Sequence, residues 1–139
     1  MAGPVYLADT SAYVAQARDS AARARFAALL TEGRLAVCQM TALEYFNNAP
    51  GPAAYEVLWT ALHGQRWMDT TAAAMDRALA VHRSLAERSQ HRHFPLPDLI
   101  IAATAEEHGA TVLHYDADYD RIAAVTGQPV EWVAPRGSL

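Results

Sequence analysis

Short apolar runs alternate with longer helical segments along the whole chain, and this alternation limits the folds it can adopt. The runs are rich in β-branched, aromatic and other apolar residues, and they show little polar alternation. That pattern is typical of strands buried on both faces of a parallel sheet. The runs lie within residues 4–11, 34–40, 65–69, 111–115 and 130–133. The sequence therefore predicts an α/β fold of three layers, a central, mainly parallel sheet flanked by helices.

Segments of helical composition separate these runs. They are bounded by Gly33, by the breaker at residues 49–52 and by a polar loop at residues 89–97. The predicted helices cover residues 12–17, 20–32, 41–48, 53–64, 70–89, 98–109 and 119–127. No internal repeat or low-complexity linker interrupts the series, so we expect one domain over residues 1–139.

Composition narrows the protein class. Apolar residues make up 52% of the 139-residue chain and the net charge is −4, values typical of a globular protein rather than a basic nucleic-acid coat. Cys38, the single cysteine, lies in an apolar run and is expected to be a buried free thiol. We find no signal peptide and no run long enough to span a bilayer, and expect a cytoplasmic protein without membrane contact.

Four acidic residues occur close to the predicted strands. Asp9 and Asp116 end the first and fourth strands, Glu44 follows the second, and Asp98 opens the helix before the fourth. The carboxyl ends of parallel strands meet at one edge of a sheet, where ligands bind in α/β folds. All four side chains are therefore candidates for one site.

Each of these acids also has a purely structural interpretation. Asp9 can cap the first helix, Thr41 and Glu44 have capping-box spacing, and Asp98 can complement a helix dipole. Asp116 and Asp118 can form an Asx-type turn. Asp120, beside Arg121, is predicted to be a solvated surface charge.

Taken together, the four acids favour a divalent metal site, because separate caps would not need like charges at one sheet edge. Oxygen ligands without histidine or cysteine suit Mg²⁺ or Mn²⁺ rather than zinc. An EF-hand is excluded, since its glycine and glutamate positions hold Arg121 and Gly127.

The quartet lies in the motifs "LADTSAYV", "TALEYF", "PDLIIAATA" and "TVLHYDADYDRIA". In order and spacing these motifs resemble the PIN-domain ribonucleases, and the last two look especially like the VapC toxins of bacterial toxin–antitoxin pairs. The resemblance implies a three-layer PIN-like fold and a metal-dependent endoribonuclease that cuts a structured RNA such as tRNA or rRNA. It further implies a VapB-like antitoxin that neutralises the toxin, and a homodimer.

Site residues carry over by position. The metal-binding and catalytic acids would be Asp9, Glu44, Asp98 and Asp116, with Asp118 as an accessory ligand. Ser11 matches a hydroxyl often found beside the first aspartate, and would orient a ligand or a phosphate. His114 departs from the family pattern, which often has threonine or serine there, and we expect a partly buried strand residue rather than a catalytic base.

Candidate contacts with RNA and with the antitoxin are less specific. Arg92 lies in a loop that leads to Asp98 and is the best candidate for a phosphate contact, although a solvated loop is an equal alternative. A solvent-facing stripe is the favoured interpretation of Arg18, Arg23 and Arg25. Core packing explains most of the aromatic residues in segments 42–48 and 55–64, but in the family these helices form part of the antitoxin groove. These residues are Tyr45, Phe46, Tyr55 and Trp59.

Three other functions compete with this hypothesis. Receiver domains and haloacid-type phosphatases also place acids at strand ends, but both need an active-site lysine, and the chain has none. A PIN fold that has lost catalysis and only binds RNA or protein remains the alternative.

Overall fold

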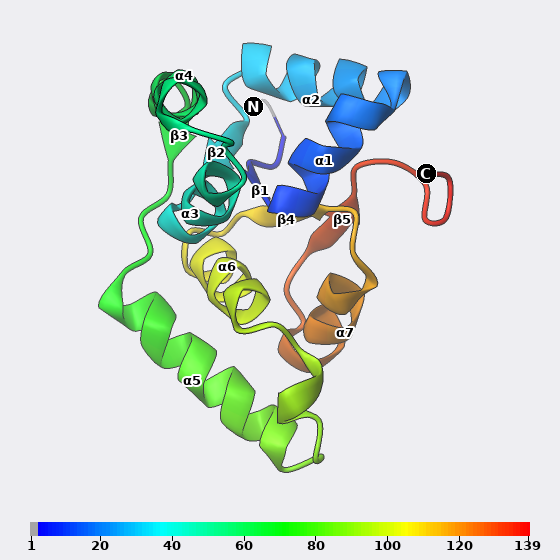
Figure 1. Ribbon diagram of the computed structural model, residues 1–139. Coiled ribbons are helices and arrows are strands. Elements are labelled where there is room, and N and C mark those ends of the chain that lie inside the picture. The colour runs from blue at the N-terminus through cyan, green and yellow to red at the C-terminus, as the bar shows by residue number, and fades with distance from the viewer. Residues whose placement is uncertain (1–2) are drawn as a thin grey trace.

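A five-stranded sheet forms the centre of the computed structural model, which describes residues 3–139 (Figure 1). The strand order is β3-β2-β1-β4-β5, and all four strand pairings are parallel. The strands are β1 (Tyr6–Ala8), β2 (Leu35–Val37), β3 (Arg66–Trp67), β4 (Thr111–His114) and β5 (Val130–Trp132). The predicted α/β fold with a mainly parallel sheet is confirmed.

Helices cover both faces of this sheet. They are α1 (Thr10–Arg18), α2 (Ser20–Thr31), α3 (Gln39–Asn47), α4 (Pro52–His63), α5 (Ala72–Ala86), α6 (Leu96–Glu107) and α7 (Ala117–Thr126), with a 3₁₀ helix, η1 (His91–His93). None of the helices in the described part of the chain combines the length and the apolar character needed to cross a membrane.

Two hydrophobic cores lie on opposite faces of the sheet. Tyr6 and Ala8 of β1 point into the core shared with α1 to α4, whereas Leu7 points into the core shared with α5 to α7. The strand residues of both cores are buried. Burial on both faces explains why the strands have no polar alternation in sequence. Cys38 is buried in the second core as a free thiol, as predicted.

Helix starts differ from the prediction at two functional positions. α3 begins at Gln39, two residues before the predicted start, so Thr41 is buried inside the helix and its hydroxyl donates to the Ala8 carbonyl at 3.0 Å. The capping-box interpretation of Thr41 and Glu44 was therefore wrong, because a cap must precede the helix. α6 begins at Leu96, which places Asp98 in its first turn.

Candidate active site

The pairing of β1 with β4 brings two of the predicted acids to one edge of the sheet. Ala8 pairs with Leu113, and the Asp9 amide donates to the Leu113 carbonyl at 2.9 Å. Asp9 then begins the turn into α1, while Asp116 begins the turn into α7. α6 and α3 supply Asp98 and Glu44 from their first and second turns.

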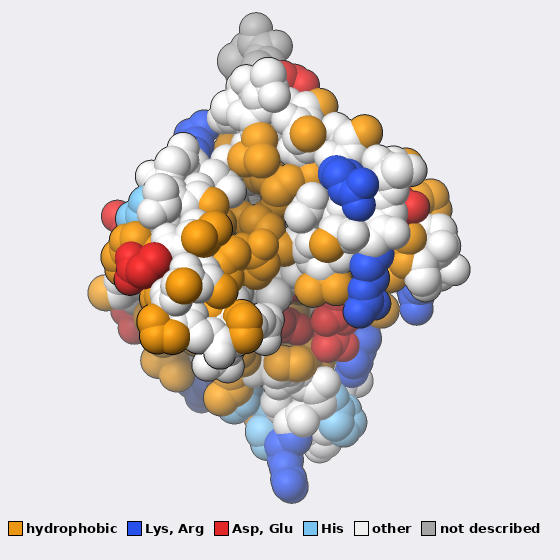
Figure 2. Space-filling view, turned by 45° about the horizontal axis from the view of Figure 1, so that its top comes forward, with side chains coloured by type: hydrophobic (Ala, Val, Ile, Leu, Met, Phe, Trp, Pro, Cys, Tyr) orange, Lys and Arg blue, Asp and Glu red, His pale blue; other side chains and the backbone are white. Residues whose placement is uncertain are grey.

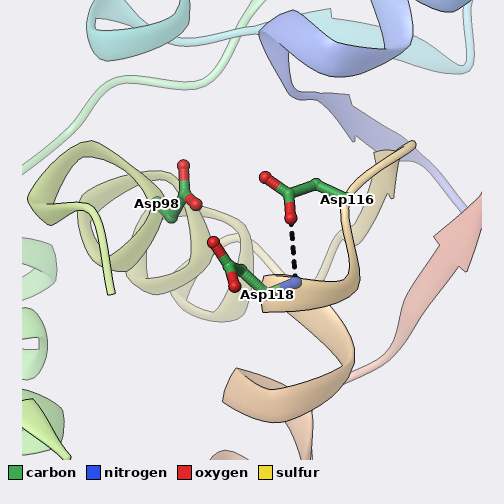
Figure 3. Close-up of side chains that lie close together, drawn as sticks. All are labelled: Asp98, Asp116 and Asp118. Carbon is green, nitrogen blue, oxygen red and sulfur yellow. Dashed lines mark hydrogen bonds between the residues drawn. The ribbon is translucent and has the colours of Figure 1, made fainter. Parts of the chain in front are cut away.

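Three carboxylates form the closest group of acids at this edge. One oxygen from each of Asp98, Asp116 and Asp118 lies within 4.8 Å of the others, and Figure 3 shows the three side chains turned toward the same space. Asp116 also caps α7, because its Oδ1 accepts a hydrogen bond from the Asp118 amide at 2.9 Å. The predicted Asx-type turn is thus present together with the acid group. Asp9 and Glu44, two of the four predicted acids, lie outside this closest group.

Asp98 is the electrostatic centre of the group. Its side chain is 6% exposed, and its Oδ2 has no hydrogen-bond partner. Burial, followed by the negative charges of Asp9, Asp116, Asp118 and Glu44, raises the pKa of Asp98 to about 8. The orphaned oxygen and the concentrated negative charge fit a divalent cation with oxygen ligands.

Two acids near Asp98, Glu44 and Asp118, also have raised pKa values. Burial raises the pKa of Glu44, and a hydrogen bond from the Thr10 hydroxyl at 3.1 Å opposes this rise. Burial and the charge of Asp116 raise the pKa of Asp118, which Arg121 opposes from 3.3 Å. Burial is the larger cause of both rises, and the charges of Asp9 on Glu44 and of Asp116 on Asp118 add to them.

Asp9 is held by hydrogen bonds on both of its carboxylate oxygens. Oδ2 accepts from the Ser11 amide at 3.0 Å and from the Ser11 hydroxyl at 2.6 Å, so Asp9 also serves as the N-cap of α1. The Ser11 hydroxyl in turn accepts from the Tyr115 amide at 2.9 Å. Ser11 therefore links the β1–α1 turn to the β4–α7 turn, which holds both acid-bearing turns together.

Two residues that contact the predicted acids were not predicted as site residues from the sequence. Tyr119 is fully buried on α7, and its hydroxyl donates to Asp9 Oδ1 at 2.7 Å. Burial and the charges of Asp9 and Asp98 raise the pKa of Tyr119 well above its ordinary value. Thr10 is the second, through its bond to Glu44. Tyr119 lies within the "DADYD" stretch, but its sequence position alone cannot distinguish a site residue from a core tyrosine.

His114 is completely buried, whereas a partly buried residue was expected. Its Nδ1 accepts the Asp116 amide at 3.1 Å, and its ring packs against Tyr119 and Trp132. Burial lowers the pKa of His114, so the ring is neutral and an acceptor at Nδ1. The histidine thus supports the backbone of the turn that carries Asp116.

Asp120 corrects another prediction. It was expected to be a solvated surface charge, but it is half-buried and accepts a hydrogen bond from the Trp132 indole at 3.0 Å. Arg136 lies 3.8 Å from the same carboxylate. The contact arises because β5 places Trp132 against α7, a pairing between segments that local sequence does not reveal.

The arginines differ in their surroundings. Arg25 forms an ion pair with Glu131 at 2.9 Å and donates to the Trp132 carbonyl, so its expected place in a solvent-facing stripe was wrong. Arg92 is exposed on η1. Arg121, which the sequence did not single out, lies over the Phe94 ring at 4.3 Å and beside Asp118.

An apolar groove follows α4, bounded by α2 along one part and by the end of α3 along the other, and we call it the α2–α4 groove. Its two adjoining cavities, of about 230 and 450 Å³, share Tyr45 and Leu58. Leu30 and Phe26 of α2 line one wall of the first cavity. Figure 2 shows hydrophobic side chains gathered in a hollow that leads toward a group of acidic side chains. Phe46 belongs to the core, whereas Tyr55 and Trp59 are 36% and 46% exposed on α4.

Known proteins are similar to this chain in sequence and in fold. A family model of the PIN domain matches residues 6–125. Ribonuclease VapC51 of Mycobacterium tuberculosis is 45% identical over 134 residues, which are 96% of this chain and 96% of that protein. Ribonuclease VapC18 of the same organism is 41% identical over 137 residues, covering 97% of this chain and 99% of that one.

Among solved structures, a chain of the DNA-bound VapBC complex from Salmonella typhimurium has a similar fold, with a TM-score of 0.74. Its identity is 18%, and the match covers 95% of this chain and 100% of that chain. A chain of VapBC-1 from nontypeable Haemophilus influenzae matches with a TM-score of 0.71 at 18% identity, covering 93% and 98% of the two chains.

Proposed function

Because the chain belongs to the PIN domain family and, within it, to the VapC ribonucleases, we propose that it is an endoribonuclease toxin that uses Mg²⁺ or Mn²⁺. Its substrate would be a structured RNA such as tRNA or rRNA. The observation that carries the proposal is the group formed by Asp98, Asp116 and Asp118, in which one oxygen of each residue lies within 4.8 Å of the others and Asp98 Oδ2 has no hydrogen-bond partner.

The three grouped carboxylates would hold the cation, and Asp9 would complete the site from the neighbouring turn. When bound, a divalent ion supplies a water of lowered pKa and positive charge for the phosphate. Asp98 must lose its proton when the cation binds, because burial and neighbouring acids raise its pKa to about 8.

Glu44 lies at the margin of the acid cluster and is the best candidate for a proton acceptor. Its raised pKa brings the carboxylate closer to the range in which it can accept a proton from water near neutral pH. The Thr10 hydroxyl holds Oε1, which leaves Oε2 free to orient the nucleophilic water.

The net charge of the chain is −4, so the protein as a whole does not attract RNA. Positive side chains close to the acids would have to bind the phosphates of the RNA backbone. Arg121 lies at the rim of the acid group, and the ring beneath it belongs to Phe94, directly after η1. Arg92 projects from η1 as an exposed side chain. We assign both arginines to contacts with RNA phosphates.

The α2–α4 groove would receive a segment of a VapB-type antitoxin. The groove is lined mainly by apolar and aromatic side chains and leads to the acids, so a peptide bound there could exclude RNA from the site. The similar folds from Salmonella typhimurium and Haemophilus influenzae come from VapBC complexes, which supports this choice of partner.

A homodimer would use a second apolar surface, the α5–α6 face. It exposes Met75, Leu79 and Leu96 around an apolar hollow of about 270 Å³. Leu79 and Leu96 are 67% and 60% exposed, which is costly for large apolar side chains unless a partner covers them. A second copy of the chain is the occupant that the family resemblance implies.

The function is tested with antitoxin-free protein incubated with total RNA in Mn²⁺ or in EDTA. We expect defined fragments that disappear with chelator, and sequencing of their ends identifies the cut site. Asp9→Asn should keep the fold and lose cleavage by about 100-fold or more. The matched control is Asp76→Asn, which removes an exposed acid of α5 and should cleave normally.

Two outcomes would contradict the proposal. RNA cutting by Asp9→Asn at the rate of the unsubstituted protein would refute the assignment of the site. Binding of RNA without any fragments in Mn²⁺ would instead favour the alternative, a PIN fold that only binds.

A further inference from the structure

The Tyr119 hydroxyl lies between two acids that reach the site from different elements. It donates to Asp9 Oδ1 at 2.7 Å and lies 3.4 Å from Asp98 Oδ1. The side chain is fully buried, so water cannot replace either partner. The shorter distance identifies Asp9 as the acceptor of the single hydroxyl proton.

Packing fixes the ring that carries this hydroxyl. The Tyr119 ring lies in the core shared with α5 to α7, and the buried His114 ring packs against it at a centroid distance of 5.1 Å. α7 itself is anchored by the Asp116 cap. The donor is therefore rigid relative to the turn that carries two of the three grouped acids.

The bond completes a set of donors around Asp9. Ser11 donates twice to Oδ2 and Tyr119 donates once to Oδ1, so both oxygens are oriented and Oδ1 keeps a lone pair for a further partner. A hydrogen bond to a charged acceptor is stronger and shorter than one to a neutral acceptor. Without the Tyr119 hydroxyl, only the Ser11 bonds to Oδ2 would hold the Asp9 carboxylate, and Oδ1 could change its position.

We propose that Tyr119 is a positioning residue whose hydroxyl, through its bond to Asp9, orients that carboxylate toward the cation held by Asp98, Asp116 and Asp118. The inference rests on the proposed metal-dependent function. Tyr119→Phe, which removes only the hydroxyl oxygen, tests this role.

A purely structural tyrosine is the competing explanation, and the chain contains a matched example. Tyr13 is also buried, at 4% exposure, and its hydroxyl donates at 3.0 Å to Gln65, a neutral amide away from the acids. Tyr119→Phe and Tyr13→Phe each remove one buried hydroxyl and leave the ring in place. Only the first should change metal binding.

The test measures Mn²⁺ affinity by isothermal titration calorimetry on antitoxin-free protein. Groups that orient a metal ligand typically contribute 10- to 100-fold in affinity. We expect Tyr119→Phe to weaken Mn²⁺ binding by about 10-fold or more, and Tyr13→Phe to bind as the unsubstituted protein does. In an Asp9→Asn background, Tyr119→Phe should have no further effect, because the tyrosine acts through Asp9.

The outcomes separate this inference from the proposed function. Normal Mn²⁺ affinity in Tyr119→Phe, with binding intact in the unsubstituted protein, overturns only the positioning role. An equal loss in Tyr119→Phe and Tyr13→Phe overturns it as well, since the effect would then be one of stability. Absence of Mn²⁺ binding by the unsubstituted protein overturns the proposed function and this inference together.

Discussion

At the scale of single residues, the site is governed by one buried carboxyl. Asp98 lies among four other acids, and its Oδ2 has no hydrogen-bond partner. Burial and these charges raise its pKa from an ordinary value near 3.8 to about 8. The folded metal-free protein therefore keeps a proton that the unfolded chain loses above about pH 4.

This difference sets the pH dependence of stability without metal. Because the folded state binds the extra proton, the contribution of Asp98 to the free energy of unfolding falls as pH rises from about 4 to about 8. In EDTA, Asp98→Asn should flatten that decline. At pH 8 the free energy of unfolding of Asp98→Asn should exceed that of the unsubstituted protein by about 1 kcal/mol or more. This difference corresponds to a rise of roughly 3 °C in the thermal midpoint.

The measurement is thermal unfolding by circular dichroism at several pH values in EDTA. Asp76→Asn on α5 is again the control, because it removes an exposed acid outside the cluster. Identical pH slopes for Asp98→Asn and the unsubstituted protein would contradict the raised pKa of Asp98.

At the scale of elements, the turn from β4 into α7 combines two functions. Asp116 caps α7 through the Asp118 amide and also belongs to the acid group. The buried His114 accepts the Asp116 amide, so the backbone of this turn is bonded on both sides of the carboxylate. A helix cap and a metal ligand are therefore compatible interpretations of one aspartate, and the sequence could not have chosen between them.

Two substitutions of Asp116 distinguish its role as the cap of α7 from the role of its negative charge. Asparagine caps helices about as well as aspartate, so Asp116→Asn should keep the metal-free stability within about 0.5 kcal/mol, or raise it through relief of repulsion. Asp116→Ala should be about 1 kcal/mol less stable than Asp116→Asn. Both should lose Mn²⁺-dependent cleavage. Urea unfolding in EDTA measures the metal-free stability of the two variants. Equal stability of Asp116→Asn and Asp116→Ala would contradict the capping role.

At the scale of the whole molecule, the sheet separates three surfaces. The acids lie at the carboxyl edge of the central strands, the α2–α4 groove opens on one side of the sheet, and the α5–α6 face belongs to the other side. Figure 1 shows α2 and α4 on one side of the sheet and α5 and α6 on the other. Substitutions in one surface should therefore leave the functions of the others intact.

In the α2–α4 groove, Leu30 is 38% exposed and lines the first cavity. Leu30→Glu places a charge in an apolar wall and should weaken binding of a co-expressed VapB-type antitoxin by about 10-fold or more. RNA cleavage by the free toxin should not change. Affinity is measured by calorimetry with the purified antitoxin, and unaltered binding would exclude this wall of the groove from the interface.

On the α5–α6 face, Leu79→Glu provides the reciprocal test. Burying an unpaired charge in a dimer interface is unfavourable, so this variant should sediment as a monomer where the unsubstituted chain forms a dimer. Its antitoxin affinity should be normal. A dimer that persists in Leu79→Glu would place the contact elsewhere on the surface.

The alternation of apolar runs and helices was enough to predict the parallel sheet, because local periodicity and burial on both faces are visible in the chain itself. It also predicted that Asp9 and Asp116 lie at the edge of the sheet, since both directly follow predicted strands in the sequence. Tertiary structure decided that Asp98, Asp116 and Asp118 form the closest group, that Asp9 is bonded to Tyr119 and that Asp120 meets Trp132. These contacts join α6, α7 and β5 across the fold, and their distances depend on how the elements pack, which no local pattern encodes.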